Sequence, residues 1–194
     1  VMYDAALFYG KKAEEESKIL RKLGLSPQGY ILATVHRAGN TDNPYRLEAI
    51  FGGLCRTALE IPVVLPLHPR TRFALEREKL FNTAQRRLRL IEPVGYLDMV
   101  MLEKNARAIV TDSGGVQKEA FFYRVPCLTL REETEWVELV NLGWNRIIPP
   151  FSADVIADAI KSSLRHFEGV EGSPYGDGQS AVKIAQYLVE WGRC

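Results

Sequence analysis

The sequence lacks the features that mark disulfide-rich, membrane-spanning and zinc-binding proteins. Its 194 residues include three cysteines, Cys55, Cys127 and Cys194, without a Cys-x-x-Cys pair, which disfavours both a disulfide framework and a zinc site. No apolar run approaches the ~20 residues that span a bilayer, and the N-terminus has no basic flank followed by an apolar signal core. We therefore expect free thiols and a soluble, cytoplasmic protein.

An excess of charge of one sign is also absent. Lysine plus arginine total 25 against 24 for aspartate plus glutamate, so the net charge is +1, and no basic block stands out. This balance gives no reason to expect a nucleic-acid partner, and any anionic ligand must be held by local groups. The length and the 46% apolar content suit one large globular domain, residues 1–194. Because the chain begins with Val1 rather than methionine, we expect it to be either a fragment of a longer protein or a processed product.

Short apolar runs alternate with helical patterns along the whole chain. The predicted strands are 30–35, 63–67, 89–91, 108–111, 125–130 and 146–148. The predicted helices are 2–23, 44–58, 71–80, 96–105, 114–122, 136–141, 153–164 and 179–191. Strands that alternate with helices pair in parallel through right-handed crossovers. The sequence therefore predicts an α/β fold with a doubly wound, six-stranded, Rossmann-like parallel sheet.

The segment after the fourth predicted strand has the pattern of a phosphate-binding turn. Ser113 can cap the following helix, and Gly114 and Gly115 leave backbone N–H groups uncovered by any Cβ at the positive end of that helix. Glu119 lies six residues past Ser113, roughly 9 Å along a helix, where a carboxylate can accept both hydroxyls of a ribose. The alternative interpretation is an ordinary capped helix start with a solvated carboxylate.

Polar residues also follow the other predicted strands, at the edge where an open parallel sheet binds its ligand. His36 can transfer a proton near neutral pH, and Arg37 beside it can hold a phosphate or carboxylate. His68 follows the second strand, and the segment 131–135 follows the fifth and is expected to face a polar ligand. Structural roles in these loops remain the alternative for each of these residues.

Signatures of metals and common cofactors are missing. Asp112 has no second carboxylate near it at ligand spacing, so we expect it to support its turn rather than bind a metal. The sequence has neither Gly-x-Gly-x-x-Gly nor a Gly-Lys-Ser/Thr phosphate loop, which counts against dehydrogenases and ATPases. We assign no metal, no cofactor, and no function to His166, which lies near the end of a predicted helix.

Four separated motifs closely resemble those of the UDP-N-acetylglucosamine 2-epimerase family and occur in the family's order. They are Thr34–Arg37 through Asn40, Thr111–Ala120, Val125–Glu135 and Pro174–Gly178. The resemblance covers nearly the whole chain. It implies a glycosyltransferase-B-like enzyme of two domains, of which this chain is the C-terminal, UDP-binding half and lacks the N-terminal domain. It also implies a UDP-sugar substrate and leaves a homodimer open for the full-length enzyme.

The same resemblance implies roles for individual residues. His36 matches a histidine implicated in catalysis, and His68 one near the interdomain cleft. The implied binding residues are Ser113, Gly114 and Gly115 for the diphosphate, Glu119 for the ribose, and Val94 and Met99 for the uracil. From their places after predicted strands, we also assign substrate-binding roles to Arg37, His68, Arg131, Thr134 and Glu135. The family interconverts UDP-N-acetylglucosamine and UDP-N-acetylmannosamine by removing the C2 proton, expelling UDP and adding it back. Most of its proton-transfer carboxylates belong to the missing domain.

Three positions depart from the family's pattern. Ala38 and Gly39 stand where the family often has an arginine and a glutamate, and Trp136 stands where it often has an arginine. These changes keep open another UDP-acetamido sugar, including a diacetamido uronic acid, and leave regulation by a second UDP-sugar undecided. Two rival functions share the donor site, namely a UDP-sugar glycosyltransferase and a stand-alone UDP-sugar-binding module.

Overall fold

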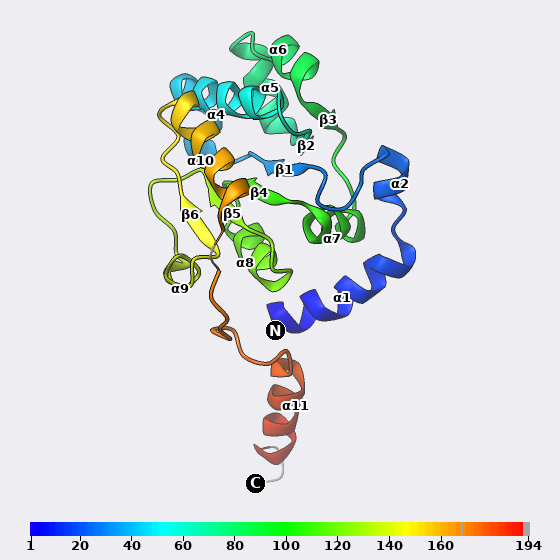
Figure 1. Ribbon diagram of the computed structural model, residues 1–194. Coiled ribbons are helices and arrows are strands. Elements are labelled where there is room, and N and C mark those ends of the chain that lie inside the picture. Colours follow the sequence, from blue (N-terminus) through cyan, green and yellow to red (C-terminus); the bar gives the residue numbers. More distant parts are fainter. Residues whose placement is uncertain (168, 192–194) are drawn as a thin grey trace.

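The computed structural model describes residues 1–167 and 169–191, and its core is one parallel sheet. The strand order is β3-β2-β1-β4-β5-β6 (Figure 1). The strands are β1 Ile31–Thr34, β2 Val63–Pro66, β3 Arg89–Ile91, β4 Ala108–Thr111, β5 Cys127–Thr129 and β6 Asn145–Ile147. The predicted six-stranded parallel sheet is confirmed. Strand order reverses between β1 and β4, so the loops that follow these two strands lie together at the edge where open parallel sheets generally bind ligands.

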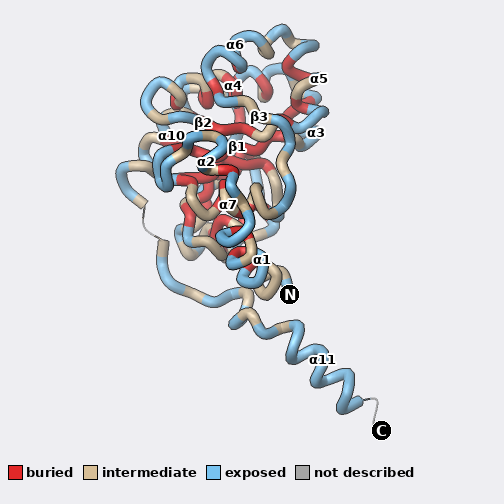
Figure 2. The backbone as a smooth tube through the Cα atoms, turned by 90° about the vertical axis from the view of Figure 1, so that its right-hand side faces the viewer, coloured by how far each residue is buried: buried red, intermediate tan, exposed pale blue. Residues whose placement is uncertain are grey.

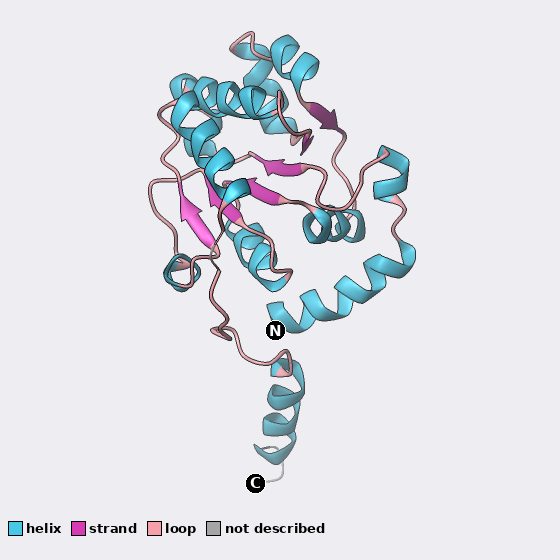
Figure 3. Cartoon of the chain, viewed as in Figure 1, coloured by secondary structure: helices cyan, strands magenta, loops and turns pink. Residues whose placement is uncertain are grey.

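Helices cover both faces of the sheet (Figures 1 and 3). One apolar layer joins the sheet to α4 Pro44–Thr57, α5 Pro69–Arg77, α6 Phe81–Arg87 and α10 Ala153–Arg165. The other joins it to α2 Ile19–Leu23, α7 Tyr96–Asn105 and α8 Gly114–Phe122. Ile31 and Ala33 point into the first layer and Leu32 into the second, as the alternation of side chains along a strand requires. Buried residues are concentrated in the sheet between the two layers (Figure 2).

Several elements differ from the prediction. The helix predicted over 2–23 is two helices, α1 Met2–Glu16 and α2, because Ser17 is extended and its hydroxyl donates to Asp98 Oδ1 at 2.6 Å. A short helix, α3 Ala38–Thr41, lies in the expected polar loop, and α6 was missed. The helix predicted over 136–141 is α9 Val137–Asn141.

Three serine and asparagine side chains test the predicted helix starts. Asn43 accepts a hydrogen bond from Arg46 N at 3.2 Å, and Ser152 accepts one from Val155 N at 3.5 Å, so both predicted caps are confirmed. Ser113 occupies the N-cap position of α8, but its side chain makes no capping hydrogen bond. The prediction of a side-chain cap there was wrong, and the N–H groups of this helix start are left for another partner.

The last helix, α11 Ser180–Trp191, stands away from the rest of the molecule (Figures 1 and 2). All of its residues from Ala181 onward are exposed, and Ala181 N donates to Asp4 Oδ2 at 2.7 Å near the start of α1. None of the described helices is long and apolar enough to cross a membrane. Cys55 and Cys127 are free thiols, as expected, whereas Cys194 lies outside the described residues.

Candidate functional site

Asp112 ties together the loops that follow β1, β4 and β5. Its carboxylate is 0% exposed and accepts hydrogen bonds from His36 N at 3.0 Å, Arg37 N at 3.0 Å and Asn40 Nδ2 at 3.1 Å. Asn40 Nδ2 also donates to Leu130 O at 3.0 Å. The sequence predicted only local support of a turn, because Asp112 meets its partners through the pairing of β1 with β4. One feature of the sequence could have revealed this contact: His36 and Asp112 each follow one of two strands that pair in parallel.

The start of α8 is covered by the loop that follows β5. Glu135 lies so close to Gly114 that a Cβ on this glycine would be 2.5 Å from Glu135 Oε1. The other carboxylate oxygen of Glu135 accepts from Arg131 Nη1 at 2.6 Å, and Trp136 Nε1 donates to Gly114 O at 2.8 Å. Burial raises the pKa of Glu135, but its backbone hydrogen bond and the Arg131 guanidinium outweigh burial and lower the pKa overall. A carboxylate therefore rests beside the helix start where the sequence predicts a diphosphate.

Glu119 projects from α8 toward α7. Tyr96 donates to Glu119 Oε1 at 3.0 Å, and burial raises the pKa of the Glu119 carboxyl while this hydrogen bond lowers it. Glu103 of α7 is fully buried, and neither of its carboxyl oxygens has a hydrogen-bond partner among the described residues. Burial and the nearby charge of Glu119 hold the pKa of Glu103 well above its usual range. Neither Tyr96 nor Glu103 was predicted from the sequence as part of this site.

A cavity of about 190 Å³ opens between the ends of β1, β2 and β3. Both residues predicted to receive the uracil, Val94 and Met99, line it together with Pro93 and Val116. His36 and His68 also line it, with ring centroids 5.5 Å apart and ring planes inclined by 31°. The walls are mostly apolar, which suits a flat ring.

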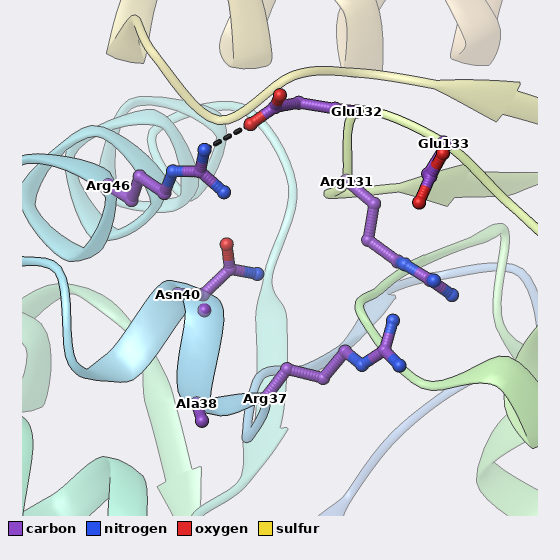
Figure 4. Close-up of a pocket in the computed structure, with 8 residues that line it drawn as sticks. Arg37, Ala38, Asn40, Arg46, Arg131, Glu132 and Glu133 are labelled. Carbon is purple, nitrogen blue, oxygen red and sulfur yellow. Dashed lines mark hydrogen bonds and ion pairs between the residues drawn. The ribbon is translucent and has the colours of Figure 1, made fainter.

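A larger cavity of about 600 Å³ lies between the start of α4 and the loop after β5 (Figure 4). Three arginines line it. Arg131 forms an ion pair with Glu135 at 2.6 Å, and the charge of Arg37 also lowers the pKa of that carboxyl. Arg46 forms an ion pair with Glu132. The remaining lining residues are Ala38, Gly39, Asn40 and Glu133. Arg46 was not predicted from the sequence, since only the fold brings α4 to this loop.

The side chain of Thr134 makes its hydrogen bonds to other residues of the protein. It is buried, its hydroxyl donates to Gln117 Oε1 at 2.6 Å, and it accepts from Trp136 N at 3.1 Å. Asn145 Nδ2 donates to the same Gln117 oxygen at 2.9 Å. Thr134 thus shapes the loop that carries Arg131 and Glu135. Within 1–167 and 169–191, no three His, Cys, Asp or Glu side chains are grouped so that they could hold a metal ion.

Comparisons of the sequence with known proteins identify its relatives. A model of the UDP-N-acetylglucosamine 2-epimerase family matches residues 1–189. The chain is 45% identical over 192 residues to UDP-2,3-diacetamido-2,3-dideoxy-D-glucuronate 2-epimerase of Pseudomonas aeruginosa, covering 98% of this chain and 51% of that protein. It is equally identical, 45% over 191 residues, to a UDP-N-acetylglucosamine 2-epimerase homolog of Methanococcus maripaludis, covering 97% of this chain and 52% of that protein.

Comparison with solved structures identifies relatives of the same family. The structure resembles UDP-GlcNAc 2-epimerase of Methanocaldococcus jannaschii in complex with UDP-GlcNAc and UDP, with a TM-score of 0.86, 36% identity, and coverage of 97% of this chain and 53% of that one. The chain spans about half the length of these relatives, and the predicted half of a glycosyltransferase-B-like fold is confirmed. By sequence and by structure, the chain belongs to the UDP-N-acetylglucosamine 2-epimerase family.

Proposed function

We propose that this chain is the UDP-binding half of a 2-epimerase that interconverts UDP-N-acetylglucosamine and UDP-N-acetylmannosamine. One observation carries the proposal, the presence of three candidate subsites around α7 and α8. They are the cavity at Val94 and Met99, the carboxylate of Glu119, and the α8 start at Ser113–Gly115. They suit the base, the ribose and the diphosphate of UDP.

Each subsite suits the part of UDP assigned to it. The cavity at Val94 and Met99 packs against the faces of the uracil. Glu119 accepts the two ribose hydroxyls as a carboxylate, a charge-assisted interaction. The N–H groups at Gly114 and Gly115 and the dipole of the nine-residue helix α8 hold the diphosphate. The same groups stabilise the negative charge that develops on UDP when its bond to the sugar breaks.

In our proposal, the chemistry at C2 of the sugar needs acid and base groups that do not belong to this chain. The chain spans about half of its relatives, and we assign the proton-transfer carboxylates to a further, N-terminal domain. The isolated chain then binds UDP but does not catalyse epimerisation. A cytoplasmic setting and a homodimeric full-length enzyme belong to the same proposal, and the mass of that enzyme in solution would test the second point.

Calorimetric titration of the chain with UDP tests the nucleotide site. Glu119→Gln should weaken UDP binding by about 10-fold or more, since a hydrogen bond to a charged group contributes on the order of 1.5–3 kcal/mol. Glu48→Gln is the matched control, because Glu48 is exposed on α4 and should leave the affinity unchanged. Absence of UDP binding by the parent chain, or equal affinities for parent and Glu119→Gln, would contradict the proposal.

A second substrate is favoured by the cavity lined by Arg37, Arg46 and Arg131, where Arg46 pairs with Glu132, Arg131 pairs with Glu135, and Arg37 adds a further cation. Guanidinium groups bind carboxylates in bidentate fashion, and a uronic acid sugar carries a carboxylate that UDP-N-acetylglucosamine lacks. A relative with 45% identity is named as a 2-epimerase of a diacetamido glucuronate nucleotide. We propose this acidic UDP-sugar as the alternative substrate of the same site.

The full-length enzyme, given each UDP-sugar alone in deuterated water, distinguishes these candidates. An epimerase exchanges the C2 proton for deuterium without any acceptor, whereas a glycosyltransferase or a binding module does not. If the acidic sugar is the substrate, Arg131→Met should slow its exchange much more than it slows exchange of the neutral sugar. If Arg131→Met slowed exchange equally for the two sugars, the arginine-lined cavity would give no reason to prefer the acidic UDP-sugar as the substrate.

A further inference from the structure

We propose that the structure holds His36 and His68 in opposite tautomers, and that Asp112 is the positioning residue that sets the tautomer of His36. One ring then offers a lone pair at Nε2 to the cavity that both line, and the other offers an N–H. The assignment follows from the hydrogen-bond partners of the two Nδ1 atoms.

His36 Nδ1 faces an atom that can only accept. Asp112 Oδ2 receives three donors, His36 N at 3.1 Å, Arg37 N at 3.0 Å and Asn40 Nδ2 at 3.1 Å. Among the described residues, the donor to Asp112 Oδ1 is His36 N, at 3.0 Å, and this oxygen lies 3.6 Å from His36 Nδ1. An imidazole lone pair directed at this buried carboxylate would be repelled, whereas an N–H is attracted. Neutral His36 therefore carries its proton on Nδ1, and Nε2 is left as an acceptor.

His68 Nδ1 faces an atom that can only donate. His68 is the N-cap residue of α5, and its Nδ1 accepts from Arg70 N at 3.1 Å. A backbone N–H has no lone pair, so Nδ1 of His68 must supply it. Neutral His68 therefore carries its proton on Nε2 and presents a donor.

The role of the two histidines toward a substrate rests on the proposed function. With the ring centroids 5.5 Å apart, one substrate group can lie within reach of both Nε2 atoms. His36 would accept a hydrogen bond from a substrate hydroxyl or amide, and His68 would donate one to a substrate oxygen. Exchanging the two tautomers would reverse both interactions, so Asp112 acts on the reaction through His36 without touching the substrate.

Nitrogen NMR of the chain tests the tautomers directly. The chain has three histidines, so long-range proton–nitrogen correlations of the ¹⁵N-labelled protein can be assigned with His36→Gln and His68→Gln. At about pH 8.5, where histidines are ordinarily neutral, we expect Nδ1–H for His36 and Nε2–H for His68. Either histidine in the other tautomer would overturn the proposal, and this result needs no Asp112 variant to fold.

A pair of variants then tests the positioning role. Asp112→Asn should move at least half of His36 to the Nε2–H form, because the acceptor facing Nδ1 loses its charge. Asn40→Ala removes another partner of the same carboxylate and should leave the tautomer of His36 unchanged. An unchanged His36 in folded Asp112→Asn would show that Asp112 does not set its tautomer.

In the full-length enzyme, Asp112→Asn should lower kcat on the order of 100-fold with little change in KM, and Glu48→Gln should change neither. A loss confined to KM would overturn the link to the reaction. If the chain fails to bind UDP while its histidines have the expected tautomers, the epimerase proposal fails and the tautomer assignment stands.

Discussion

The hydroxyl of Tyr96 on α7 donates a 3.0 Å hydrogen bond to Oε1 of Glu119 on α8. This bond favours the ionised form of a carboxyl whose pKa burial raises. The same hydrogen bond also occupies one of the two Glu119 oxygens that we propose as acceptors of the ribose hydroxyls. The protonation state of Glu119 should therefore control nucleotide affinity.

UDP-sugar affinity should fall as the pH is lowered. Because the pKa of Glu119 is raised, its carboxylate should begin to be lost at a pH above the ordinary value of about 4.3 for glutamate. Tyr96→Phe removes the hydrogen bond that lowers this pKa, so the loss of affinity should move to higher pH. Calorimetry from pH 5 to 8 measures both, with a UDP-sugar as ligand because its diphosphate does not titrate in this range. Glu119→Gln should show no such pH dependence, and a sloping profile for that variant would assign the effect to another group.

The buried carboxyl of Glu103 should make folding less favourable as the pH rises. Its pKa is raised in the folded state, so above the ordinary pKa of about 4.3 the unfolded chain releases a proton that the folded chain retains. The free energy of unfolding then declines with rising pH until the folded pKa is reached. Glu103→Gln should increase the free energy of unfolding at pH 7.5, because the amide takes up no proton on folding, by ~1.4 kcal/mol for each pH unit between the unfolded and folded pKa values below that pH, and the gain should shrink toward pH 5. Urea denaturation at both pH values measures this, with exposed Glu15→Gln as control.

Gly114→Ala should weaken UDP binding without unfolding the protein. The close contact of the added Cβ is with the end of a flexible side chain, Glu135 Oε1 at 2.5 Å, which can move aside, while Trp136 Nε1 at 3.6 Å is at ordinary contact distance. The methyl group would cover the start of α8 where we place the diphosphate. Calorimetry should show reduced affinity, while the thermal midpoint should stay within a few degrees of the parent. Unaltered UDP affinity would mean that the diphosphate is bound elsewhere.

The same substitution at Gly53 should act on stability instead. A Cβ there would lie 2.8 Å from Ile156 Cβ and 3.0 Å from Ala153 O, in the contact between α4 and α10. The two helices must separate to admit it, which should cost about 1–3 kcal/mol of unfolding free energy. Thermal or urea unfolding measures this loss. An equally stable Gly53→Ala protein would show that α10 can move on α4 freely.

Removing residues 179–194 should leave the stability of the remaining chain unchanged within about 0.5 kcal/mol. The described residues of α11 after Ser180 are all exposed, including Ile184, Leu188 and Trp191. Its polar contacts with the rest of the molecule are at its exposed start, where Ala181 N donates to Asp4 and Lys183 pairs with Asp177. Urea unfolding of the shortened and complete chains compares them, and a large loss would mean that α11 packs against the body in solution.

Local patterns along the sequence predicted the sheet, because its central strands β1, β4 and β5 are short runs buried on both faces and helices separate the strands. Contacts between distant segments could not be predicted in this way. The break at Ser17 depends on Asp98, which lies 81 residues away, and the orientation of the loop at His36 depends on Asp112, which lies 76 residues away. The sequence indicated that polar residues would gather at the strand ends. It could not indicate that Thr134 would turn inward to Gln117 while Arg131 faced the cavity.

The bonds between Asp112 and the loop at His36 also determine when the site can form during folding. They join residues separated by 76 positions, and they can form only after β4 has aligned beside β1 in register. Closing so long a segment of chain is slow compared with forming a helix or a hairpin. The proposed nucleotide-binding edge should therefore be completed late in folding, after the central strands have assembled.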